Sequence, residues 1–284
     1  MPEALEGMLR QAREGFVVMN IEHLNVYPPF ARWSDGEIRT LDDGEKQIYL
    51  FGEPIEQYVA TADVPDPFGS APDVDIAPFE GHIKASIEAE PRNFDQDTWA
   101  SVRAESPLPI KEVSKWSALP PLEWLLAIPV IWGLKRFAGS FLDRLGSLSA
   151  EGLASWIRNS SQRSLDAQRD RYLTISMELD GYRWVRGFVP FGPDDDETVI
   201  KEALDSAGYL AEVAGLQNEG ATQNAQQIAY VFDGLEWHLA WFIRDGVAYQ
   251  TRYFADHMPQ PERFLGQPYL PDGVEQQEIP GDES

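Results

Sequence analysis

Apolar and polar residues alternate most clearly in the C-terminal half of the chain. Residues 171–179 alternate strictly, as expected for a strand with one buried face, and Asp180-Gly181 predicts a tight turn after it. We expect the order ββ-α-βββ, with strands at 171–179, 182–189, 228–232, 235–243 and 247–253 and a helix from about 194 to 213. Asp-Gly turns join antiparallel strands, so the pattern predicts an antiparallel sheet with a helix packed on one face.

The N-terminal half is also predicted to be rich in strands. Residues 3–14 favour a short helix, because their apolar side chains recur at helical spacing. The strands expected in this half lie at 16–27, 46–51, 80–90 and 96–105. Residues 63–79 are rich in proline and aspartate and are predicted to form a long loop.

The most apolar stretch lies in the middle of the chain, where residues 119–134 read LPPLEWLLAIPVIWGL. Pro120-Pro121 can begin a helix, and residues 134–145 continue with apolar side chains at helical spacing. The pattern therefore predicts a hydrophobic helical segment over 119–145. Its uncharged run is too short for an ordinary membrane-spanning helix.

These elements together predict an α+β protein of two strand-rich regions joined by a central hydrophobic helical segment. We expect a strand-rich N-terminal domain over 1–110 and a helical connector over 111–170. An α+β domain over 171–267 and a flexible acidic tail over 268–284 complete the predicted organisation.

The formal net charge of −24 changes the range of expected partners. Binding to nucleic acid through phosphate contacts requires clustered lysine and arginine, so that class is excluded. The chain has no cysteine, which excludes disulfides and thiolate metal sites. The first sixteen residues carry early acidic side chains and no signal-peptide pattern, so we expect a cytoplasmic, possibly membrane-associated protein.

The central apolar segment allows two interpretations. It can be a buried helix that joins the two halves, or a helix that inserts into a membrane or docks on a protein. The only basic stretch, residues 135–186, directly follows the apolar block and would face anionic lipid head groups. The side chains expected to bind a partner or membrane are Trp124, Ile128, Trp132, Lys135, Arg136 and Phe137.

Glu236 and His238 are weak candidates for a metal or acid–base site. They lie two residues apart on a predicted strand and so share one face. An ordinary polar sheet face is the simpler interpretation. No nucleotide-binding, metalloprotease or nucleophile motif is present, so the sequence assigns no catalytic residue, no cofactor and no metal.

The function expected from these patterns is a non-enzymatic interaction protein that acts through protein–protein contacts, self-association included. One alternative is a membrane-acting protein that inserts residues 119–145 into lipid. A second is a hydrolase or metal-dependent enzyme that uses the strand face of Glu236 and His238.

Overall fold

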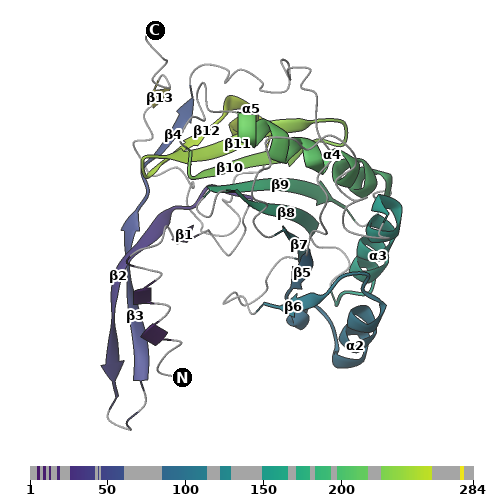
Figure 1. Cartoon of the computed structure of the whole chain (residues 1–284), viewed down its shortest axis with the longest axis horizontal. Helices are drawn as coiled ribbons and strands as arrows, with labels where there is room; N and C mark the ends of the chain where they lie inside the picture. Colours follow the sequence, from purple (N-terminus) through teal and green to yellow (C-terminus); the bar gives the residue numbers. More distant parts are fainter. Residues whose placement is uncertain are drawn as a thin grey trace.

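The structure is a computed structural model of the chain. It describes residues 26–41, 44, 46–60, 85–113, 122–128, 149–165, 171–179, 183–192, 197–216 and 225–257, and the short pieces 5–6, 9–10, 13, 18–19 and 276–277. Within these residues the chain has a mixed α/β fold, in which a large curved sheet carries helices and a narrow ribbon of strands stands off one side (Figure 1).

The large sheet has ten strands within the described residues, and both halves of the chain contribute strands to it. In spatial order they are β13 (Gln276–Gln277), β4 (Gln57–Ala60), β12 (Val247–Gln250), β11 (Trp237–Arg244), β10 (Gln227–Phe232), β9 (Arg183–Phe191), β8 (Arg171–Leu179), β7 (Leu122–Ile128), β5 (Ser86–Ala89) and β6 (Ile110–Glu112). A smaller sheet contains β1 (Val18–Met19), β2 (Ala31–Thr40) and β3 (Lys46–Pro54).

The order ββ-α-βββ predicted for the C-terminal half is confirmed. Strands β8 and β9 form an antiparallel pair, α4 (Glu197–Leu216) follows, and β10, β11 and β12 continue as antiparallel neighbours. The expectation of a wholly antiparallel sheet is wrong, because β9 and β10 are parallel. The chain returns from β9 to β10 through α4, and a helical crossover of this kind joins parallel strands.

The predicted central helix is wrong where the structure describes it, because residues 122–128 form strand β7. This strand pairs parallel with β8 and antiparallel with β5, so it lies inside the sheet. A strand covered on both faces reads as a continuous apolar run, which sequence periodicity does not distinguish from a buried helix. Within the described residues no helix has the length and apolar content of a membrane span.

The strand predicted over residues 96–105 is also wrong, because the helix α2 (Gln96–Glu105) occupies this range. Asp95 caps the helix and accepts a hydrogen bond from the backbone N–H of Thr98 at 2.8 Å. An aspartate just before a helix satisfies N–H groups that have no partner within the helix. The strand expected over 80–90 is confirmed at Ser86–Ala89, and residues 63–79 lie outside the described residues.

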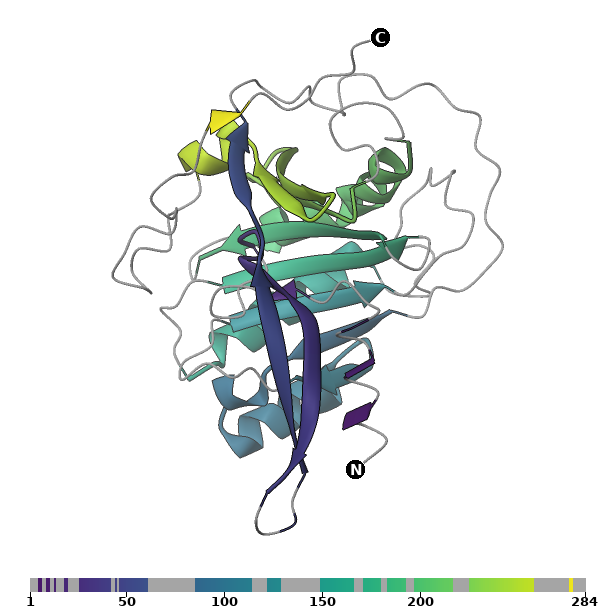
Figure 2. The same cartoon turned by 90° about the vertical axis from the view of Figure 1, so that its left-hand side faces the viewer.

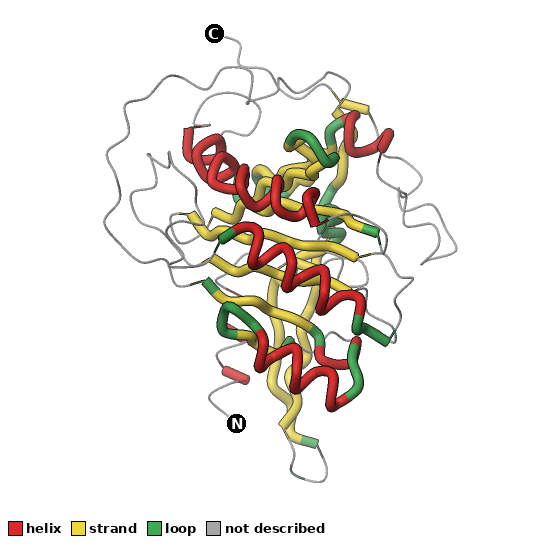
Figure 3. The backbone as a smooth tube through the Cα atoms, turned by 90° about the vertical axis from the view of Figure 1, so that its right-hand side faces the viewer, coloured by secondary structure: helices red, strands yellow, loops and turns green. Residues whose placement is uncertain are grey.

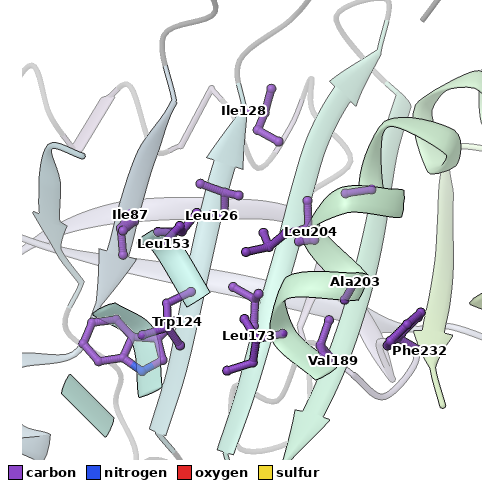
Figure 4. Packing of buried hydrophobic residues seen from close by; sticks show 14 of the residues in the cluster. Ile87, Trp124, Leu126, Ile128, Leu153, Leu173, Val189, Ala203, Leu204 and Phe232 are labelled. Carbon is purple, nitrogen blue, oxygen red and sulfur yellow. The ribbon is translucent and has the colours of Figure 1, made fainter. Parts of the chain in front are cut away.

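Three helices cover one face of the large sheet (Figure 3). They are α2, α3 (Ala150–Gln162) and α4, and the main core lies between them and the strands. Side chains from β7, β8 and β9 meet Leu153 of α3 and Leu204 of α4 there (Figure 4). A Cβ added at Gly187 of β9 would lie 2.6 Å from the Leu210 side chain and 2.8 Å from that of Trp237, so any larger residue here requires these side chains to move.

The second face of the sheet holds a smaller apolar cluster beneath β10, β11 and β12. Trp241 donates from Nε1 to the carbonyl of Val26 at 2.8 Å, and Tyr27 packs edge-on against Phe254 of α5 (Arg252–His257). Ile55 joins the same cluster from the segment between β3 and β4. This cluster attaches the start of β2 and the end of β3 to the large sheet.

Toward β7, β8 and β9 the second face becomes polar. Thr174 donates to the buried carboxylate of Glu123, and Arg186 lies on the neighbouring strand β9. Burial lowers the pKa of Arg186, and the negative charge of Glu123 opposes that shift. The buried carboxylate of Glu123 and the partly buried guanidinium of Arg186 therefore lie on the same face of the sheet.

Candidate functional site

The structure places the predicted binding residues of the apolar block in the core, as far as it describes them. Trp124 has no exposed surface and Ile128 is 2% exposed. The indole N–H of Trp124 donates to the Ser161 hydroxyl at 2.7 Å. The other four predicted residues lie outside the described residues; they are Trp132, Lys135, Arg136 and Phe137. Neither described side chain can reach a membrane or a partner while the sheet is folded.

The feature that stands away from the core is the ribbon formed by β2 and β3 (Figure 2). These strands pair antiparallel from Ala31 and Pro54 at the root to Thr40 and Lys46 at the tip, with one bulge beside Trp33. We call this pair of strands the ribbon. An isolated two-stranded hairpin is marginally stable in water, so the ribbon depends on its attachment to the rest of the molecule.

The root of the ribbon is firmly attached. The N–H of Ile55 donates to the Phe30 carbonyl at 2.9 Å, and the buried Ile55 side chain sits in the second apolar cluster. Past Ile55 the chain continues directly into β4, which pairs parallel with β12 of the large sheet. The N–H of Ala248 closes this junction by donating to the Glu56 carbonyl at 2.8 Å. The base of the ribbon is thus joined to the large sheet by hydrogen bonds, by the buried Ile55 and by the direct continuation of the chain into β4.

The two faces of the ribbon differ. On one face Ile48 and Leu50 are partly buried, and a Cβ added at Gly36 would meet Leu9 of the N-terminal segment at 3.0 Å. On the other face Tyr49 is 36% exposed and Phe51 is 48% exposed. Strand residues alternate between faces, so these two aromatic rings lie side by side on the open face.

Charged groups surround the two rings. Register places Asp35 directly opposite Phe51 and Glu37 directly opposite Tyr49. Arg39 pairs with Glu37, and its guanidinium lies 4.5 Å from the centre of the Tyr49 ring. This open aromatic face, lined by carboxylates, is an exposed apolar patch within a strongly acidic protein.

Asp35 also connects the ribbon to the N-terminal segment. The Nε of Arg13 donates to its carboxylate at 2.6 Å, and Nη2 of the same guanidinium donates to the Gly36 carbonyl at 2.8 Å. The hydrogen bond from Arg13 and a second one from the Gly36 N–H lower the pKa of Asp35. The carboxylate at this position therefore stays ionised at neutral pH.

Glu236 and His238 are brought together at the turn between β10 and β11, with Asp233 as a third member. His238 Nε2 lies 2.9 Å from Asp233 Oδ2 and 3.7 Å from Glu236 Oε1. The other oxygen of Asp233 accepts hydrogen bonds from the N–H groups of Leu235 at 2.8 Å and Glu236 at 2.9 Å. The turn thereby fixes the Asp233 carboxylate with one oxygen aimed at the imidazole.

A stack of rings holds the imidazole from the other side. His238 stacks on Tyr253 of α5 with ring centres 3.9 Å apart, and Tyr253 stacks on His257 at 4.4 Å. Burial, together with the negative charges of Asp233 and Glu236, raises the pKa of Tyr253. Burial acts to raise the pKa of Asp233, but hydrogen bonds from Glu236, Leu235 and His238 outweigh it and lower that pKa.

Sequence reasoning missed both the third acid and the ribbon face. Asp233-Gly234 is a pair typical of a tight turn, and a turn motif does not show where the second carboxylate oxygen points. The strand of Tyr49 and Phe51 was predicted, but alternation alone does not say which of its faces is covered.

Comparison of the chain with protein-family models, curated proteins and solved structures finds no match.

Proposed function

We propose that this chain is a non-enzymatic interaction protein that binds a protein partner through the open face of the ribbon. The observation that carries the proposal is the exposure of Tyr49 and Phe51, which lie on the same face of the ribbon. Large aromatic side chains lose little conformational entropy on binding and dominate the energetics of many interfaces.

The charge of the ribbon and of the whole chain indicates the chemistry of the partner. Residues 31–54 hold six acidic and three basic side chains, and the chain carries a formal net charge of −24. Like charges disfavour a second copy of this chain, anionic lipid and nucleic acid as occupants. We therefore propose that the partner is a protein whose binding surface combines an apolar patch with lysine or arginine side chains.

The direct test is site-specific crosslinking in cells, followed by a titration with the purified partner. A photoreactive phenylalanine analogue at position 51 is expected to capture the partner. The same analogue at position 235 should not capture it, although Leu235 is 88% exposed and so more accessible than Phe51 at 48%. Leu235 lies at the β10–β11 turn of the large sheet, away from the ribbon.

With the purified partner, Phe51→Ser is expected to weaken binding at least about tenfold, equivalent to roughly 1.4 kcal/mol. The control Leu235→Ser removes a large exposed apolar side chain elsewhere and should leave the affinity unchanged. Higher ionic strength should slow association, because charge steers the encounter. Equal affinity of wild type and Phe51→Ser would overturn the proposal, as would crosslinks from position 235 alone.

A further inference from the structure

The turn between β10 and β11 brings three metal-ligating side chains together away from the ribbon. Among the described residues, donor atoms of Asp233, Glu236 and His238 all lie within 4.8 Å of one another. In a tetrahedral site with bonds of about 2.1 Å, neighbouring donor atoms are about 3.4 Å apart. The separations of 2.9 Å and 3.7 Å from His238 Nε2 bracket that value.

We propose that Asp233, Glu236 and His238 bind a divalent transition-metal ion of the Zn²⁺ class, with the fourth position open to water. One imidazole nitrogen and two carboxylate oxygens form a donor set that Zn²⁺ accepts, whereas Mg²⁺ and Ca²⁺ prefer oxygen ligands alone. This inference does not depend on the proposed function of the ribbon.

Neighbouring groups orient two of the three proposed ligands, Asp233 and His238. Backbone N–H groups hold one oxygen of Asp233, and the other oxygen faces His238 Nε2 at 2.9 Å, where a cation could bind between them. The stack on Tyr253 fixes the plane of the His238 ring. Partners of this kind around a ligand set its orientation and are a large part of metal affinity. Glu236 is mostly exposed and can swing onto the ion with little cost to the fold.

Charge at the turn also favours a cation. Two carboxylates face one imidazole, so the three groups together remain negative even when His238 is protonated. A metal would replace the proton between His238 and Asp233, so its binding should weaken as the pH falls.

The test is calorimetric titration of the untagged full-length chain with Zn²⁺ after treatment with a chelator, and Co²⁺ absorption gives a spectroscopic readout. We expect one ion per chain. Asp233→Asn keeps an oxygen for the turn hydrogen bonds but removes the charged ligand, and Glu236→Gln changes an exposed side chain. Each should lower the Zn²⁺ affinity at least about tenfold.

Asp245→Asn is the matched control, because it makes the same change in another hairpin turn. Asp245 has a φ of 54°, a left-handed conformation that asparagine also tolerates. This variant should bind Zn²⁺ like the wild type. The proposal is overturned if the wild type binds no Zn²⁺, or if Asp233→Asn and Glu236→Gln bind it with unchanged affinity.

Discussion

At the scale of single residues, two neighbouring serines in the core differ in whether their hydroxyl groups have a hydrogen-bond partner among the described residues. Ser160 and Ser161 are neighbours on α3, and both are fully buried. The Ser161 hydroxyl accepts the indole N–H of Trp124, whereas the Ser160 hydroxyl has no hydrogen-bond partner among the described residues. A buried donor left without its acceptor costs about 1–3 kcal/mol, whereas removing an unpaired hydroxyl costs little.

Substitution of these two serines by alanine should therefore have different effects. Ser161→Ala should lower the free energy of unfolding by about 1–3 kcal/mol, because it leaves the Trp124 N–H unsatisfied in the core. Ser160→Ala, the matched control one residue away, should be neutral or slightly stabilising. Urea denaturation of the two variants and the wild type measures both changes. Equal losses in the two variants would show that the Trp124 hydrogen bond contributes nothing specific.

The same scale explains which parts of the candidate sites could be predicted. The sequence predicts that Glu236 and His238 share one face of a strand, but Glu236 lies in the turn before β11 (Trp237–Arg244). Their side chains still come together, with Glu236 Oε1 3.7 Å from His238 Nε2. The third acid, Asp233, joins them only because its turn aims one oxygen back at the strand. The direction of that oxygen depends on the backbone conformation of the turn, which cannot be read from the amino-acid sequence.

At the scale of the elements, local signals predicted hairpins and caps well and failed where an element is buried on both sides. Asp245 and Gly246 adopt positive φ in the turn between β11 and β12, as an Asp-Gly turn requires. Ser149 caps the start of α3, because its hydroxyl accepts from the Gly152 N–H at 3.0 Å. Strand β7 has no exposed face to alternate with, so its apolar run was mistaken for a helix.

The cap of α3 gives a prediction at this scale. Ser149→Ala should lower the free energy of unfolding by about 1 kcal/mol, because an N–H group at the helix start loses its acceptor. Ser155→Ala is the matched control, since Ser155 lies in the middle of the same helix, where alanine is favoured. Denaturant titrations of both variants measure the difference. A loss no larger in Ser149→Ala than in Ser155→Ala would contradict the capping role.

At the scale of the whole molecule, the sheet crosses the boundaries that the sequence predicts between domains. β5 and β4 come from the predicted N-terminal domain, and β7 comes from the predicted connector. β5 pairs with β7, β7 pairs with β8, and β4 pairs with β12. Pairing between strands so far apart in sequence leaves no local pattern, which is why the shared sheet could not be predicted.

The central claim of this account is that residues 122–128 of the apolar block form an internal strand, which holds their buried side chains in the core instead of leaving them available for a membrane or a partner. Hydrogen exchange of residues 122–128 in the full-length chain, with and without anionic liposomes at low salt, tests it most directly. Amides inside a sheet open only with large unfolding events and exchange slowly. We predict strong protection of Leu122–Ile128, equal to that of neighbouring β8 and unchanged by lipid. Weak protection without lipid that rises when liposomes are added would contradict the account and favour a membrane-acting segment.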